Sequence, residues 1–260
     1  MSNIRQAFQN GKAFIPFITC GDPDLESTKR NVRAAVAAGA DLVELGIPFS
    51  DPTAEGPVIQ AANLRALSGG VTTDAVFQMV AELREELTTP LVFMTYANVV
   101  FSYGIERFAA RAAEVGIDGI ILPDVPFEEK EEFAPAFRAV GIDFISMIAP
   151  TSMARIREIA AAAEGFLYVV SSLGVTGVRQ EINTDLSGML ASVRQANPSL
   201  PAAIGFGIST PAQAKRMAEV ADGVIVGSAI VRIMAEKGCE ADEEIARYVR
   251  EMKTAANTFQ

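Results

Sequence analysis

Histidine is absent from the 260 residues of this chain, and cysteine occurs only twice. Without histidine the chain cannot use a Ser-His-Asp or Cys-His pair, a histidine-ligated metal, or a histidine acid or base. The two cysteines, Cys20 and Cys239, lie far apart with no CxxC or Cys/His pattern, which argues against structural zinc and a disulfide framework. Proton chemistry therefore falls to Asp, Glu, Tyr, Lys or Cys, and we expect no metal site.

Long apolar segments and excess positive charge are also missing. No run of about 18 apolar residues occurs, so we expect no transmembrane helix. Residues 1–6 lack the basic-then-apolar layout of a secretory signal. The formal net charge of −10 argues against binding to nucleic acid or to an anionic membrane. These features predict a cytoplasmic protein that binds neither.

Short apolar runs alternate with amphipathic helical patterns along the chain, half of whose residues are hydrophobic. In one recurring arrangement a helix closes at a small residue, an Asp follows, and an apolar strand begins; it occurs at Asp41, Asp118, Asp143 and Asp222. Strands that are apolar on both faces and alternate with helices indicate a parallel sheet covered by helices. Eight such units predict an α/β fold, the (β/α)8 TIM barrel, with residues 1–260 as a single domain.

The helical patterns exceed the eight that a plain barrel needs. We expect an extra N-terminal helix at residues 4–9 and extra short helices after strands two and eight, at 58–67 and 229–237. Pro135 lies inside the predicted helix 128–140, where it should cause a kink or break. A six-stranded doubly wound sheet is the competing architecture, but no Gly-x-Gly-x-x-Gly motif follows the first strand.

The second predicted strand ends in a carboxylate, Glu44, and a loop rich in Gly and Pro follows with Asp51 and Glu55. Burial raises the pKa of a carboxylic acid, so that a glutamate can both give and take a proton near neutral pH. Catalytic groups in barrels lie at the carboxyl ends of strands and in the loops after them. Glu44 is therefore a candidate acid or base; pairing with a buried Arg or capping a helix is the alternative.

Glycine-rich loops follow the last two strands, at 205–209 and 227–231. Gly227 and Ser228 open a helix, whose N-terminus presents free N–H groups to an anion. Many barrels bind phosphate in this way. The long loop 171–183 after strand six is either a lid or binding segment, or a disordered surface loop.

Three further polar residues lie near predicted strand ends. Tyr96 and Tyr168 could both reach the mouth of the barrel; a core position is favoured for Tyr96, and both interpretations stay open for Tyr168. Asp124 could orient a loop, face a partner or cap a helix.

Seven segments, in order and over nearly the whole length, resemble the α subunits of tryptophan synthase: 16–23, 44–52, 96–98, 123–126, 174–177, 205–209 and 227–231. The resemblance implies a carbon–carbon lyase of tryptophan biosynthesis. Its reaction would be the retro-aldol cleavage of indole-3-glycerol phosphate to indole and D-glyceraldehyde 3-phosphate. No metal or organic cofactor is implied in this chain.

The resemblance also implies roles for single residues. Glu44 matches the acid/base residue, and Glu55 matches the carboxylate that stabilises the indole N–H, a place where Asp is usual. The longer side chain of Glu55 would require the loop backbone to sit farther back. The remaining matches are Gly177, Gly207, Gly227 and Ser228 at the phosphate, Thr176 in the mobile loop, Tyr168 lining the pocket, and Phe17 and Met94 at the indole ring.

The same resemblance implies a partner, a β subunit that carries pyridoxal phosphate, in an α2β2 tetramer. Loops 48–57 and 171–183 would dock on it, with Asp51 and segment 123–126 nearby. Isolated subunits of this kind are expected to be poor catalysts. Three rival functions are a phosphosugar isomerase or epimerase, a lyase that works alone, and an idle subunit that only activates β. The first usually needs a His, a metal-ligand set or a Lys at a strand end, and no predicted strand end offers a Lys or His.

Overall fold

Parallel strands form one sheet in this computed structural model, which describes residues 3–150, 152–171 and 185–258. The strands are short and mostly apolar, and all but the two shortest are buried along their whole length. In chain order they are β1 (Ala13–Thr19), β2 (Val43–Gly46), β3 (Leu91–Met94), β4 (Gly119–Ile121), β5 (Asp143–Phe144), β6 (Met147–Ile148), β7 (Leu167–Val170), β8 (Ala202–Gly205) and β9 (Gly223–Val226).

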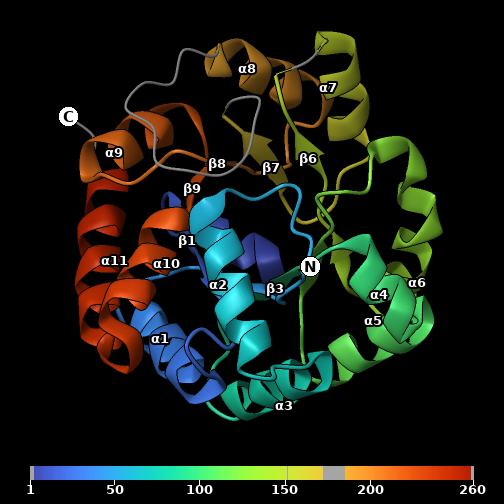
Figure 1. Cartoon of the computed structure of the whole chain (residues 1–260). Helices are drawn as coiled ribbons and strands as arrows, with labels where there is room; N and C mark the ends of the chain where they lie inside the picture. The colour runs from blue at the N-terminus through green and yellow to red at the C-terminus, as the bar shows by residue number, and fades with distance from the viewer. Residues whose placement is uncertain (1–2, 151, 172–184, 259–260) are drawn as a thin grey trace.

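The sheet closes on itself through its shortest strands. Its order is β5-β4-β3-β2-β1-β9-β8-β7-β6, so the two ends are neighbours in the sequence, separated only by Ile145 and Ser146. The Ile145 N–H donates to the Ile120 carbonyl at 2.9 Å, and the Tyr168 N–H donates to the Ser146 carbonyl at 3.0 Å. β5 and β6 are therefore one interrupted strand, and the predicted TIM barrel is confirmed (Figure 1).

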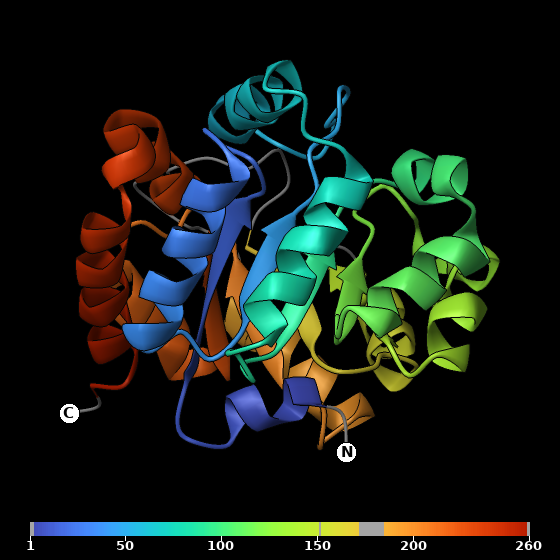
Figure 2. The ribbon, with the colours of Figure 1, turned by 90° about the horizontal axis from the view of Figure 1, so that it is seen from below.

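Helices surround the barrel, and one short helix crosses its lower end (Figure 2). In chain order they are η1 (Asn3–Phe8), α1 (Leu25–Ala37), α2 (Pro57–Ser68), α3 (Thr73–Arg84), α4 (Ala97–Tyr103), α5 (Ile105–Glu114), η2 (Phe127–Glu132), α6 (Ala134–Ala139), α7 (Met153–Ala161), α8 (Leu186–Ala196), α9 (Pro211–Val220), α10 (Ser228–Lys237), η3 (Gly238–Glu240) and α11 (Asp242–Ala256). The predicted extra helices correspond to η1, α2 and α10.

Two local features differ from a simple helical expectation. α4 was not predicted, and it ends at Gly104, whose φ of +93° suits a residue without a Cβ. The predicted helix 128–140 is broken, as Pro135 led us to expect, into η2 and α6. Pro135 lies in the first turn of α6, where its missing N–H removes no helical hydrogen bond.

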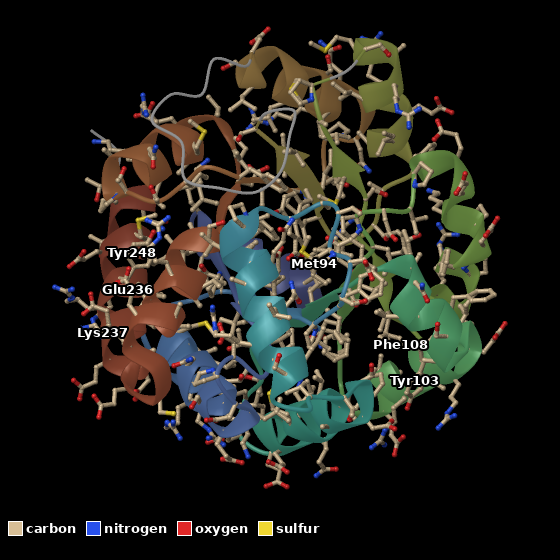
Figure 3. The ribbon with its side chains drawn as sticks, in the orientation of Figure 1. Met94, Tyr103, Phe108, Glu236, Lys237 and Tyr248 are labelled. Carbon is tan, nitrogen blue, oxygen red and sulfur yellow. The ribbon has the colours of Figure 1, made fainter. Side chains whose placement is uncertain are left out.

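Alternation of side chains along the strands creates two apolar cores. One fills the barrel, with Ile15, Phe17 and Phe166 among its members, and the other lies between the sheet and the helices. In the view down the barrel, Met94 of the inner core lies near the centre, whereas Phe108 of the outer core lies among the surrounding helices (Figure 3). Three members of the inner core, Phe17, Met94 and Tyr168, line a pocket near the mouth of the barrel.

The aspartates that recur before strands tie the lower end of the barrel together. Asp41 accepts from the Phe14 N–H at 2.7 Å, Asp118 from the Leu91 N–H at 2.9 Å, and Asp222 from the Ala202 N–H at 3.0 Å. In each case the acceptor precedes one strand and the donor lies at the start of the strand before it. These three Asp side chains thus connect neighbouring strands by hydrogen bonds at their amino ends.

Candidate active site

A pocket opens where the strands of the barrel end. Eight of the ten predicted site residues line it together: Phe17, Glu44, Glu55, Met94, Tyr168, Gly207, Gly227 and Ser228. They come from strands and loops that are far apart in the sequence. The other two, Thr176 and Gly177, lie outside the described residues, as does most of the predicted loop 171–183.

Glu44 lies on β2, between Phe17 of β1 and Val92 of β3. Its side chain points into the barrel, and the residue is only 1% exposed. Within the described residues, neither carboxyl oxygen has a hydrogen-bond partner, so the ion pair or helix cap considered above is not found there. Burial raises the pKa of Glu44 to about 8. At neutral pH most of the free protein therefore holds this carboxyl group protonated.

Glu55 enters the same pocket from the loop before α2, and it is 4% exposed. Burial raises its pKa to about 7, while a hydrogen bond from Asn63 acts in the opposite direction. The backbone beside it is held by Tyr96, whose hydroxyl oxygen accepts from the Ala54 N–H at 3.1 Å. The Tyr96 ring also stacks on Phe49, with ring centroids 5.1 Å apart. Tyr96 therefore supports the loop rather than lining the pocket.

Tyr168 forms one wall of the pocket from β7. Burial and the neighbouring carboxylates of Glu44 and Glu55 hold the pKa of its hydroxyl well above the usual range, so the group stays neutral. Its ring lies against Gly205, where a Cβ would collide with the hydroxyl. Gly205 is thus needed for the close approach of a side chain, besides any role in a turn.

The other side of the pocket is formed by backbone. Gly207 has a φ of +74°, and α10 begins at Ser228 directly after Gly227. The first N–H groups of a helix have no partner inside it, and the helix dipole places partial positive charge at this end. An anionic group of a ligand can therefore bind here without a basic side chain.

Four apolar pocket residues were not predicted: Ile59, Phe206, Ile208 and Ile225. Their side chains leave the pocket apolar except for its carboxyl groups, the Tyr168 hydroxyl and the backbone at α10. Phe206 has a φ of +74°, which is uncommon for a residue with a side chain, and its ring packs edge-on against Tyr168 at 6.2 Å. Phe206 and Ile208 lie in the glycine-rich segment 205–209 noted above, but no motif marks Ile59, and only the inward alternation of β9 could have indicated Ile225.

Asp124 lies outside the pocket lining. Both of its carboxyl oxygens accept from the Ala97 N–H, at 3.0 and 3.2 Å, at the first turn of α4. Of the interpretations left open above, helix capping is the one that these contacts support.

The described residues contain no cluster of three or more His, Cys, Asp or Glu side chains that could hold a metal. Cys20 is buried, Cys239 is exposed, and both are free thiols. Among the described helices, none has the length and apolar character that crossing a lipid bilayer requires.

Comparisons with known proteins agree on one family. A family model described as "Tryptophan synthase alpha chain" matches residues 2–259. The tryptophan synthase alpha chain of Lactiplantibacillus plantarum is 50% identical over 256 residues, covering 98% of this chain and 96% of the relative. The crystal structure of tryptophan synthase subunit alpha from Legionella pneumophila is 36% identical, covers 100% of both chains and has a TM-score of 0.86. A chain from a structural study of the tryptophan synthase α2β2 complex of Pyrococcus furiosus is 36% identical over 94% of this chain and 99% of that one, with a TM-score of 0.80.

Proposed function

The chain belongs to the tryptophan synthase alpha chain family, which cleaves indole-3-glycerol phosphate in tryptophan biosynthesis, and we propose that Glu44 and Glu55 perform the cleavage here. The observation that best supports these roles is that both buried carboxyl groups lie in one pocket, and that Glu44 has no hydrogen-bond partner among the described residues. Such a group is free to act on a substrate.

Glu44 gives one proton and takes another in this mechanism. With a pKa of about 8 it starts protonated and donates its proton to C3 of the indole ring, which forms a positively charged indolenine. The Glu44 carboxylate then removes the proton of the C3′ hydroxyl. The carbon–carbon bond breaks, its electron pair returns to the ring to give indole, and the oxygen becomes the aldehyde of glyceraldehyde 3-phosphate. Glu44 ends protonated, as it began.

Glu55 stabilises the charge that appears between these two proton transfers. Its carboxylate would accept a hydrogen bond from the indole N–H, which becomes more acidic as the ring gains positive charge. Phe17, Met94 and Tyr168 line the same pocket and would contact the ring. These contacts hold the substrate between the two carboxyl groups, which favours reaction by orientation.

The substrate phosphate would lie at Gly207, Gly227 and Ser228, where the first turn of α10 offers backbone N–H groups. Thr176 and Gly177, outside the described residues, would complete this end of the site. The cleavage needs no cofactor in this chain, and pyridoxal phosphate would belong to the partner β subunit.

A β subunit is the proposed partner, in an α2β2 tetramer, with docking loops 48–57 and 171–183. The solved complex of the Pyrococcus furiosus relative supports this assignment. Two large apolar side chains that are strongly exposed, Leu64 of α2 at 67% and Phe101 of α4 at 69%, also favour a protein partner for these helices. Asp51 and segment 123–126 would lie near the interface.

The proposals on domain organisation, binding partners and location rest on the sequence and on the continuous sheet. We propose that residues 1–260 form a single domain, because strands from β1 to β9 share one barrel. The charge of −10 supports a protein that binds neither nucleic acid nor an anionic membrane. We also propose a cytoplasmic location.

Release of glyceraldehyde 3-phosphate from indole-3-glycerol phosphate tests the proposal, with the purified chain alone and with a pyridoxal-phosphate β subunit. Weak activity alone and a several-fold or larger rise on mixing is the expected result. Full activity alone would indicate a lyase that works without a partner. Wild-type activity in a Glu44→Gln variant would overturn the catalytic assignment.

A further inference from the structure

We infer that Asn63 is a positioning residue, which holds the Glu55 carboxylate in the pocket and favours its charged form. The inference rests on the proposed role of Glu55 in cleavage. Asn63 lies on α2, is 5% exposed and does not line the pocket itself. It would therefore act through Glu55, without touching the substrate.

The Asn63 side chain joins three parts of the active-site loop. Its Nδ2 donates to Glu55 Oε2 at 3.0 Å and to the Ile59 carbonyl at 3.0 Å. Its Oδ1 accepts from the Phe49 N–H at 3.2 Å. The start of the loop, its carboxylate and the first turns of α2 thus meet at one amide group.

These partners leave the amide only one orientation. The Phe49 N–H is a donor and must face the Asn63 oxygen, whereas the Ile59 carbonyl is an acceptor and must face the nitrogen. The nitrogen has two protons, one for Ile59 and one for Glu55. The contact with Glu55 is therefore a donated hydrogen bond, and such a bond favours the ionised carboxylate over the neutral acid.

Within the part of the chain that the structure describes, Asn63 is the one group that favours the charge of Glu55 in this way. The ionisable side chains that share its surroundings are Glu44 from β2, Tyr168 from β7 and Tyr96 at the end of β3, and all three are acids. Among the described residues, no Lys or Arg lines the pocket. Burial alone would push the carboxyl group toward its neutral form, in which it could not stabilise a positive ring, and the Asn63 hydrogen bond opposes that.

The test uses kcat/KM for cleavage by the full chain at pH 6 and at pH 8. Activity requires ionised Glu55, so it falls as the pH drops through the pKa of that group. Asn63→Asp has the same shape, and its Oδ1 can still accept from Phe49, but its second oxygen faces Glu55 with no proton to donate. The ratio of kcat/KM at pH 6 to that at pH 8 should fall about fivefold, which corresponds to a rise of about one unit in the pKa of Glu55 from about 7.

Two further variants keep the test decisive. Asn63→Ala removes the donor without adding charge and should lower the same ratio in the same direction, by a smaller factor; it decides the question if the Asp variant does not fold. Gln60→Ala is the matched control on α2, because Gln60 Nε2 donates to the backbone carbonyl of Glu55 at 2.7 Å and not to its carboxylate. Its ratio should equal that of the wild type.

An unchanged ratio in both Asn63 variants, even with lower activity, would overturn the inference and leave Asn63 a purely structural residue. An equal fall in the Gln60 variant would do the same, because loosening of the loop would then explain the effect. Glu55→Gln distinguishes a failure of the proposed role of Glu55 from a failure of the inference about Asn63. If that variant keeps wild-type activity, the proposed role of Glu55 fails; if it is inactive while the Asn63 ratios do not move, only the inference about Asn63 fails.

Discussion

A carboxyl group at the lower end of the barrel has several hydrogen-bond donors, whereas one at the mouth has none among the described residues. At the lower end, Asp118 is surrounded by donors: Arg84 Nη2 at 2.6 Å, the Leu91 N–H at 2.9 Å and Asn3 Nδ2 at 2.9 Å. At the mouth, Glu44 is more deeply buried and has no donor among the described residues. The Asp118 carboxylate is thus held by donors of the protein itself, whereas the Glu44 carboxyl group has no partner among the described residues and is available to a substrate.

The carboxylate at the amino ends of the strands thus contributes to stability, and the carboxyl group at their carboxyl ends contributes to function. A buried carboxylate with several donors fixes neighbouring strands, and removing it leaves its partners unsatisfied. A buried carboxyl group without donors lowers the stability of the fold once it ionises, but it can exchange a proton with a substrate. The amino ends of barrel strands generally serve stability, and their carboxyl ends carry catalysis.

Glu44→Gln should give the largest effect, and at neutral pH, where Glu44 is mostly protonated, it should be on activity alone. The amide cannot give and take a proton, so we expect kcat for cleavage to fall about 10³-fold or more, with the thermal unfolding midpoint nearly unchanged. Steady-state release of glyceraldehyde 3-phosphate and a thermal melt measure the two quantities. A variant that unfolds several degrees earlier would mean that Glu44 has structural partners.

The pH dependence of stability should show the free carboxyl group directly. Glu44 has a pKa of about 8 when folded and an ordinary value of 4.5, so between those values the folded chain binds more protons than the unfolded chain. Its contribution to stability is therefore present at low pH and is lost as the pH rises. From pH 5 to pH 8 the wild type should lose roughly 3 kcal/mol of unfolding free energy through this group.

Urea titrations at the two pH values measure this difference, and Glu44→Gln is the matched control because it cannot titrate. The difference in unfolding free energy between wild type and variant should shrink, or reverse in sign, as the pH rises. Parallel pH profiles for the two proteins would show that Glu44 has an ordinary pKa, and the contrast between the ends of the barrel would then lose its electrostatic basis.

Asp118→Asn makes the same exchange of carboxylate for amide at the other end, with the opposite expected outcome. The amide loses the ion pair with Arg84, whose guanidinium also donates to the carbonyls of Gly116, Leu87 and Thr89 and would stay buried. We expect a loss of about 2 kcal/mol in unfolding free energy, because both charges are largely buried. Below its melting temperature the variant should cleave substrate within about twofold of the wild-type rate. A large loss of kcat without a loss of stability would contradict the division of roles.

The features of the fold and of the site that could be predicted from sequence are those that a few neighbouring residues indicate. A carboxylate that ends an apolar run identified Glu44, and Gly followed by Ser at a junction of strand and helix identified Gly227 and Ser228. Each signal lies within a few residues and has a direct physical meaning: a charged group in an apolar setting, or a backbone free to approach an anion. The alternation of strands and helices predicted the barrel for the same reason.

The parts that could not be predicted depend on contacts between distant segments. Asn63 stands in an ordinary helical sequence, and only the fold of the loop from Phe49 to Glu55 over α2 gives its amide three partners. The interruption of the fifth strand at Ile145 and Ser146 could not be predicted, because a single serine between apolar residues does not indicate a break in a strand. Seven residues of α4 are likewise too few for a clear helical period, so the capping contact of Asp124 could not be chosen over its alternatives.

The smallest expected effect concerns Glu55. Its carboxylate is intermediate between Asp118 and Glu44, because it is buried and has one donor, Asn63, among the described residues. Glu55→Asp shortens the side chain by one methylene, so its oxygens should withdraw from Asn63 and from the substrate ring. We expect kcat/KM to fall about tenfold with little change in stability, since a displaced charge is stabilising only where it meets the reacting group. Glu85→Asp, the same exchange at an exposed position on the C-terminal side of α3, should leave kcat/KM unchanged. Undiminished activity in Glu55→Asp would show that the loop adjusts to either length, and that the position of its backbone, rather than Asn63, sets where the carboxylate lies.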